Sequence, residues 1–174
     1  MQVLRRSSDE WSILAPQRHR IYEDTKRADC ARWTDGGHWM TNAAQARFLL
    51  HWRDGGVHAE FFGHVGDDVL WKADDAVHHD PLVTTLRHVI IDMSHVQSVT
   101  ASETIAIEQA AVDLGTSRYI PPLRIALVGT LPEARELMLE YKHQGERIGV
   151  PWTFELFDAL PEARAWVLAE VSAP

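Results

Sequence analysis

The stretch from Arg87 to Thr104, RHVIIDMSHVQSVTASET, constrains the fold more than any other part of the chain. Its apolar run at 89–91 does not alternate with polar residues, which is typical of a strand covered on both faces. Small hydroxyl residues follow, and then a helical pattern begins. In open α/β sheets, ligands and partners bind where a strand leads into a helix. The stretch therefore predicts both the fold class and the place of the site.

Strand and helix patterns alternate from residue 46 onward. Asp54-Gly55 is a strong hairpin signal between two strands. The predicted strands are 46–52, 57–62, 87–93, 123–128 and 152–157, and the predicted helices are 65–79, 100–114, 132–144 and 161–171. The order ββαβαβαβα predicts an α/β fold: a mixed, mostly parallel sheet with an N-terminal antiparallel hairpin and helices packed on it.

The helix expected at 100–114 is predicted to bury one stripe of side chains. Residues three or four positions apart share a helix face. The stripe is predicted at Thr104, Ile107, Ala111 and Leu114.

The first 45 residues do not show these patterns. Apolar residues in 1–39 are scattered without a period, and a short helix near 16–29 is an alternative. We expect 1–45 to be a poorly ordered or loosely attached extension, and 46–174 to be a single domain. A further hypothesis is that Met40 is the natural start, which an intact-mass measurement showing residues 1–39 would reject.

The 174-residue chain has a formal net charge of −8. Residues 40–174 carry 10 Lys and Arg against 19 Asp and Glu, so this part repels phosphate backbones and anionic membranes. We expect no nucleic-acid partner, and an acidic surface fits a protein partner with a basic patch. The single cysteine, Cys30, and the lack of a long apolar segment predict a cytoplasmic location without membrane insertion.

Three segments of the chain resemble the STAS domains, the family of the anti-sigma-factor antagonists. HVIIDMSHV resembles the family's strand and loop, RIALVGTLPEARELM resembles a later strand and helix, and FELFDALPEARAWV resembles its final helix. The resemblance covers residues 46–171 and is to the SpoIIAA-like branch, a fold also related to the CRAL-TRIO lipid carriers. It implies a SpoIIAA-like fold and a non-enzymatic regulatory role.

The resemblance also implies a phosphorylation site. In the antagonists, a kinase that is itself the anti-sigma factor phosphorylates the second Ser of Asp-Ser-Ser-Gly. Aligned from Asp92, that motif falls on Thr100-Ala101-Ser102-Glu103, so Ser102 takes the phosphoacceptor position although the other three residues differ. The expected partner-contact surface comprises Ser94, His95, Ser98, Thr100, Ser102 and Glu103.

The same four residues also form a capping box, in which Thr100 and Glu103 bond to each other's backbone amides at the start of a helix. Ser102 would then lie in the first turn with an unengaged side chain, where the helix dipole tolerates a phosphate. No Lys or Arg lies between Arg87 and Arg118 to hold that phosphate. Phosphorylation is therefore expected to repel a partner rather than to order a loop.

Neither a metal site nor an enzyme is predicted. The ten histidines include no pair at the spacing of a His-Glu-x-x-His helix, and no cysteine is near them. Ser94 or Ser102 with Asp92 and His95 has the residue types of a nucleophilic triad, but Asp92 and His95 lie too close along one strand and loop to converge on either serine. No cofactor is expected.

Two functions stay open on the sequence. The leading hypothesis is a regulatory module that binds a protein partner, in the manner of an anti-sigma-type kinase, at the Ser94–Glu103 surface. The alternative is a carrier or sensor of a lipid or other small apolar ligand, suggested by the CRAL-TRIO relation and by an aromatic content beyond that of a minimal core. An apolar cavity between the sheet and the helices would favour the alternative.

Overall fold

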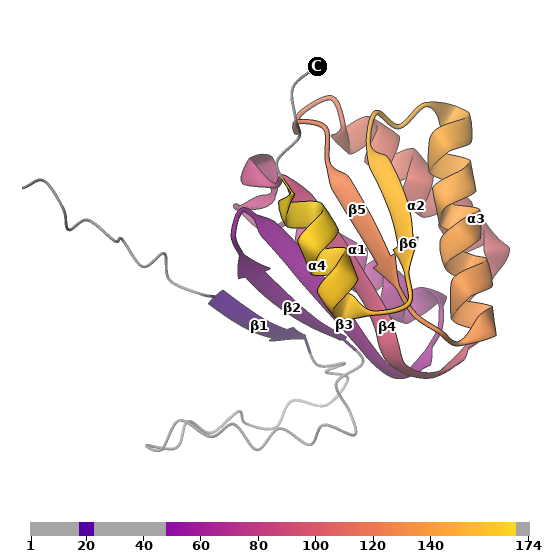
Figure 1. Ribbon diagram of the computed structural model, residues 1–174. Coiled ribbons are helices and arrows are strands. Elements are labelled where there is room, and N and C mark those ends of the chain that lie inside the picture. Colours follow the sequence, from indigo (N-terminus) through magenta and orange to yellow (C-terminus); the bar gives the residue numbers. More distant parts are fainter. Residues whose placement is uncertain (1–17, 23–47, 170–174) are drawn as a thin grey trace, which may run out of the picture.

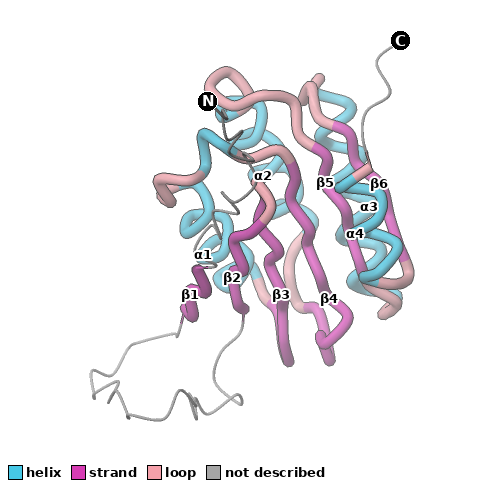
Figure 2. The backbone as a smooth tube through the Cα atoms, turned by 60° about the vertical axis from the view of Figure 1, so that its left-hand side comes forward, coloured by secondary structure: helices cyan, strands magenta, loops and turns pink. Residues whose placement is uncertain are grey.

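The computed structural model describes the backbone of residues 18–22 and all of residues 48–169. Six strands form one sheet, in which spatial order equals chain order (Figure 2). They are β1 (Arg18–Tyr22), β2 (Phe48–Arg53), β3 (Gly56–Val65), β4 (His88–Val99), β5 (Arg124–Val128) and β6 (Thr153–Phe157). The β1–β2 and β2–β3 pairs are antiparallel and the other three are parallel, which confirms the predicted fold class.

Helices cover both faces of this sheet. The connections between parallel strands contain α1 (Asp67–His78), a 3₁₀ turn (Val83–Thr85), α2 (Glu103–Thr116) and α3 (Pro132–Ile148), and α4 (Leu160–Leu168) follows β6. Right-handed crossovers that step in one direction place their helices on one face. The chain then turns back after β6, so α4 lies on the opposite face, in front of the sheet in Figure 1.

Alternation along the strands divides the core into two clusters. The larger cluster lies between the sheet and α1–α3, where β2 contributes Phe48, Leu50 and Trp52, and β3 contributes Val57, Ala59 and Phe61. The smaller cluster lies under α4, and its buried residues are Ile90, Ala126, Val128, Ala163 and Val167. Each face of the sheet therefore has its own packing partner.

The hairpin turn has the geometry that its sequence predicts. Asp54 and Gly55 have φ angles of 53° and 73°, as a two-residue turn between twisted antiparallel strands requires. In the N-terminal segment, residues 18–22 form strand β1, so the alternative of a short helix near 16–29 is wrong there. The rest of the expected extension 1–45, the proposed start at Met40 and the last residues of the predicted helix 161–171 lie outside the described residues.

Strand β4 is longer than predicted, because residues 94–99 continue the strand instead of forming a loop. β5 ends at Val128, opposite Asp92, so the second half of β4 pairs with β3 alone. Two register shifts interrupt that pairing, as β-bulges do. A strand with a single neighbour and solvent on one side carries polar residues, which explains why its sequence resembles a loop.

Among the described residues, none of the helices combines the length and the apolar character needed to cross a lipid bilayer.

Candidate functional site

A cavity of about 90 Å³ lies between the sheet and helices α1, α2 and α3. Its lining is mostly aliphatic and includes Leu70, Leu86, Ile91, Leu123, Ile125, Leu127, Met138 and Trp152. The volume corresponds to about three water molecules in the liquid, and an engineered apolar cavity of about 150 Å³ binds benzene. The cavity therefore suits a small, mostly apolar guest.

Three alanines leave this space open. Ala59 of β3, Ala73 of α1 and Ala106 of α2 all line the cavity, and each is at least 95% buried. A larger side chain at any of these positions would occupy room that the alanine methyl group leaves. The cavity thus lies where β3, α1 and α2 meet, and each of them has an alanine in the lining.

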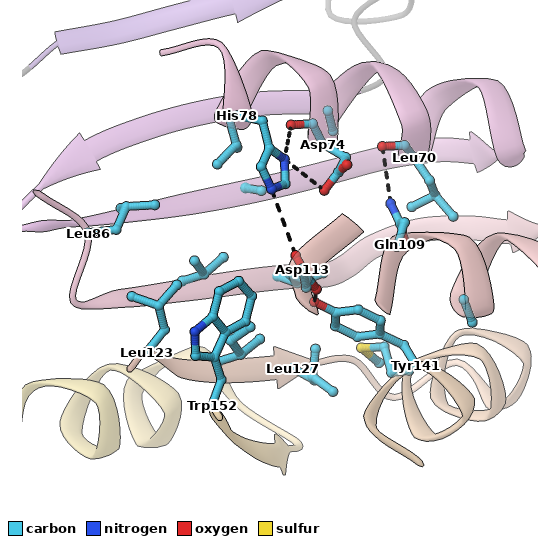
Figure 3. Close-up of a pocket in the computed structure, with 18 of the residues that line it drawn as sticks. Leu70, Asp74, His78, Leu86, Gln109, Asp113, Leu123, Leu127, Tyr141 and Trp152 are labelled. Atoms are coloured by element: carbon cyan, nitrogen blue, oxygen red, sulfur yellow. Dashed lines mark hydrogen bonds and ion pairs between the residues drawn. The ribbon is translucent and has the colours of Figure 1, made fainter. Parts of the chain in front are cut away.

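Four polar side chains gather at one end of the cavity (Figure 3). His78 lies on the last turn of α1, one turn after Asp74, and its Nδ1 lies 2.9 Å from the Asp74 carbonyl oxygen and 3.3 Å from Asp74 Oδ1. This contact orients the ring, so that Nε2 faces Asp113 Oδ1 of α2 at 3.9 Å. The Tyr141 hydroxyl of α3 donates to Asp113 Oδ2. The cluster thereby joins three helices.

Burial and charge shift the protonation of this cluster. Burial raises the pKa of Asp113 to about 7, and the charge of Asp74 adds to this, against the Tyr141 hydrogen bond. Burial would lower the pKa of His78, but Asp74 and Asp113 outweigh it and raise that pKa to about 9. Burial also raises the pKa of Tyr141 well above its usual value. At neutral pH, His78 therefore carries a proton on Nε2, and Tyr141 is uncharged.

The same residues offer three possible metal ligands, because atoms of Asp74, His78 and Asp113 lie within 4.8 Å of one another. The 3.9 Å between His78 Nε2 and Asp113 Oδ1 exceeds the roughly 3.3 Å between ligands of a tetrahedral zinc ion. Asp74 moreover lies at Nδ1, not at the nitrogen that faces Asp113. The geometry is that of an ion-pair network, and the expectation that there is no metal site stays a prediction.

Another polar group borders the cavity just before β6. Trp152 is 92% buried, and its indole N–H has no hydrogen-bond partner among the described residues. Trp52, elsewhere in the core, has an equally unpaired indole N–H. An unpaired indole N–H is thus not specific to the cavity.

The opposite face of the sheet holds a second buried His–Asp pair. His58 Nε2 lies 3.2 Å from Asp92 Oδ2, and the Ser94 amide donates to Asp92 Oδ1 at 2.9 Å. Burial would raise the pKa of Asp92, but these hydrogen bonds outweigh it and lower the pKa. Both carboxylate oxygens of Asp92 therefore have a hydrogen-bond partner, and in this sense His58 and Asp92 form a closed pair.

The residues expected to contact a partner lie in two groups. Ser94, His95 and Ser98 are on β4, and Thr100, Ser102 and Glu103 are at or before the start of α2. In the first group, His95 Nε2 lies 3.3 Å from Glu60 Oε1, and Ser98 Oγ is hydrogen-bonded to His64 Nδ1 at 2.7 Å. All except Ser98 are exposed, so five of the six are on the surface.

The predicted capping box is wrong. The N-cap of α2 is Ser102, two residues later than predicted, and no side chain caps the helix. The Ser102 side chain is also hydrogen-bonded, contrary to the prediction. The amide and hydroxyl of Ser102 donate to the two carboxylate oxygens of Asp67 at 2.7 and 2.9 Å. Asp67 begins α1, so this contact ties the starts of two helices together. That long-range partner cannot be seen in the local sequence.

A surface hollow of about 690 Å³ lies beside Glu103, between the start of α2 and helix α3. Its rim is acidic, and its lining residues are Val99, Ala101, Glu103, Glu133, Glu136, Leu137, Leu139, Glu140 and His143. Leu139 is 49% exposed. One residue of the expected partner surface therefore borders an acidic hollow with an exposed apolar side chain.

No protein-family model matches the chain, and no curated protein matches it. Among solved structures, the chain is similar to an uncharacterized protein of the DUF3478 family from Shewanella loihica PV-4, described as having a SpoIIAA-like fold. The two share 13% identity at a TM-score of 0.39, over 69% of this chain and 91% of the other. That description names the fold that the motifs of this chain resemble, and it names no activity.

Sequence reasoning missed the polar cluster in the cavity. The predicted stripe on α2 is out of register, because the buried residues are Ile105, Ala106, Ala110 and Asp113, whereas Ile107 is 44% exposed. Asp113 thus stands on the buried side of its helix. A carboxylate in line with buried Ala106 and Ala110 is the signal that would have pointed to the site.

Proposed function

We propose that the protein binds a small, mostly apolar ligand in the cavity between the sheet and α1–α3, as a carrier or sensor without catalysis. The cavity itself carries this proposal: its lining is mostly apolar, and the cluster of Asp74, His78, Asp113 and Tyr141 lies at one end. Small-molecule sites typically combine a mostly apolar wall with a few polar groups that fix orientation. Ligand binding was the alternative on the sequence, and the mostly apolar cavity supports it.

Xenon tests this proposal, because it enters apolar cavities without needing a polar contact. We expect a saturable ¹²⁹Xe NMR shift with the wild-type protein. Ala106→Leu should abolish it, because the larger side chain fills the cavity. Ala111→Leu is the matched control, since Ala111 is exposed on the same helix and should leave the shift unchanged. A wild-type protein without a saturable shift would contradict the proposal.

The acidic hollow favours a second candidate function, which we propose beside the first: recognition of a basic segment of a partner protein. Glu103, Glu133 and Glu136 are exposed on the rim of the hollow. Exposed carboxylates around an apolar side chain such as Leu139 complement a segment with Lys or Arg beside an apolar residue. Phosphorylation of Ser102 belongs to this candidate, because a phosphate there would be repelled by Asp67 and Glu103.

Charge reversal separates this candidate from non-specific attraction. Glu103→Arg and Glu136→Arg should reduce recovery of a bound partner from native extract at least tenfold. Glu162→Arg is the control, since Glu162 is exposed on α4, across the sheet. Equal recovery with all three variants would reject the hollow as the contact surface. Mass spectrometry of the native protein tests Ser102 separately, and Ser102 unmodified under all growth conditions would count against phosphorylation.

A further inference from the structure

We propose that the ligand of the cavity carries a hydroxyl group, which bridges His78 Nε2 and Asp113 Oδ1. This inference rests on the proposed ligand-binding function and names the chemical class of the ligand. It follows from the spacing of the two side chains, from the hydrogen bonds that they already make, and from the size of the cavity.

The spacing leaves room for one bridging atom. His78 Nε2 and Asp113 Oδ1 are 3.9 Å apart, which is too far for a direct hydrogen bond. An oxygen atom about 2.8 Å from each would complete two hydrogen bonds of ordinary length. Both side chains line the cavity, so a group that enters it can reach this position (Figure 3).

The existing hydrogen bonds decide which atoms are available. His78 Nδ1 is already directed at the Asp74 carbonyl oxygen, which leaves Nε2 to face the cavity cluster. Tyr141 donates to Asp113 Oδ2, which leaves Oδ1 as the acceptor nearest His78. Where Asp113 is ionised, the bridging group must therefore accept from His78 Nε2 and donate to Asp113 Oδ1.

A hydroxyl group does both with one atom, because it has an O–H donor and two acceptor lone pairs. A ketone only accepts, and a halide or ether offers Asp113 no proton. A carboxylate would face the nearby charge of Asp74, which lies 3.3 Å from the same imidazole ring. The donor and acceptor inventory thus selects an alcohol.

The volume limits the rest of the ligand. A cavity of about 90 Å³ holds only a short chain or a small ring. The lining beyond the polar cluster is mostly apolar, with Leu127 and Ile125 from the sheet and Met138 from α3. We infer that the ligand class is a short-chain alcohol, for which 1-butanol is a suitable probe.

An ordered water molecule could make the same bridge, and the experiment must separate this case. Amide NMR titrations with 1-butanol and 1-chlorobutane compare two probes of similar shape, only one of which has a hydroxyl group. We expect 1-butanol to bind about tenfold more tightly, as two added hydrogen bonds imply. Equal affinity would overturn the inference, since a retained water would then satisfy the two side chains.

His78→Leu should remove the preference for 1-butanol while leaving 1-chlorobutane binding unchanged. His79→Leu is the matched control, because His79 also lies near a carbonyl and a carboxylate one turn earlier but is exposed and does not line the cavity. A preference that persists in His78→Leu would contradict the bridge. Failure of xenon and of both probes to bind would instead reject the proposed function, so the two failures are distinguishable.

Discussion

Asp92 and Asp113 are both buried carboxylates beside a histidine, yet their surroundings shift their pKa values in opposite directions. Asp92 lies 3.2 Å from His58 and accepts the Ser94 amide, and its pKa is lowered. Asp113 lies 3.9 Å from its histidine and close to Asp74, and its pKa is raised to about 7. The first pair is complete, and the second is missing a contact.

The buried polar groups on the two faces of the sheet have different surroundings. Under α4 both carboxylate oxygens of Asp92 have hydrogen-bond partners, although His58 also lines a hollow of about 260 Å³ on this face. Under α1–α3 the polar cluster stands at the end of a cavity. His78 and Asp113 remain 3.9 Å apart there, beyond the length of a direct hydrogen bond.

The largest effect is expected from breaking the closed pair. Asp92→Ala leaves the His58 ring and the Ser94 amide without their carboxylate, and hydrogen bonds to a charged group are worth about 1.5–3 kcal/mol each. Urea unfolding at neutral pH measures this loss, and the xenon shift should persist wherever the variant is folded. A loss below about 1 kcal/mol would show that the pair is not the structural contact described here.

The next effect is a pH dependence of stability that comes from the polar cluster in the cavity, through Asp113 and His78. The raised pKa of Asp113 means that the folded state binds more protons than the unfolded state from about pH 4 to 7, so stability falls as pH rises. The raised pKa of His78 gives a further loss between its unfolded value of 6.5 and about 9. Together they should lower the unfolding free energy by several kcal/mol between pH 5 and 9.

Asp113→Asn should flatten this profile between pH 5 and 7, because the charge is removed while an acceptor for Tyr141 is kept. The control is Asp75→Asn on the exposed side of α1, which should leave the profile as in the wild type. An unchanged profile in Asp113→Asn would mean that Asp113 does not titrate in this range. Asp113 would then lack the raised pKa that distinguishes it from Asp92.

A smaller effect is expected from Tyr141→Phe. Loss of the hydroxyl removes the hydrogen bond to Asp113 and should cost about 1–2 kcal/mol. Because that bond lowers the pKa of Asp113, its loss should also move the midpoint of the pH profile upward. A variant with wild-type stability and an unchanged midpoint would show that Tyr141 does not hold the carboxylate.

The smallest effect is expected at the surface. Ser102→Ala removes a hydroxyl contact with Asp67 that is open to solvent, so we expect a loss of about 0.5–1 kcal/mol. A double-mutant cycle with Asp67→Ala isolates the contact, and the two losses should be less than additive in the double variant. Strict additivity would show that the hydroxyl and the carboxylate do not interact in solution.

The order of elements could be predicted because strong periods and turn residues mark it. Asp54-Gly55 identified the hairpin, and the buried strands carried continuous apolar runs. The polar half of β4 was predicted as a loop because its single neighbouring strand leaves it partly in solvent. The pattern of polar and apolar residues indicates how exposed a segment is. In β4 that exposure depends on which strands pair with it, which the local sequence does not show.

The candidate site could not be predicted in the same way. The cavity depends on Ala59, Ala73 and Ala106, which are far apart in sequence and meet only in the folded chain. The stripe on α2 was misplaced by one position, which hid Asp113 among expected surface residues. The contact of Ser102 with Asp67 spans 35 residues and has no local signature. Convergence of distant small and polar residues is a property of packing.

Methyl NMR of alanine-labelled protein titrated with 1-butanol tests the central claim most directly. The account predicts saturable shifts for the methyl groups of Ala59, Ala73 and Ala106, which line the cavity. It predicts none for Ala126 and Ala163, which are equally buried under α4. Shifts of similar size on both faces, or no saturable shift at the three cavity alanines, would contradict it.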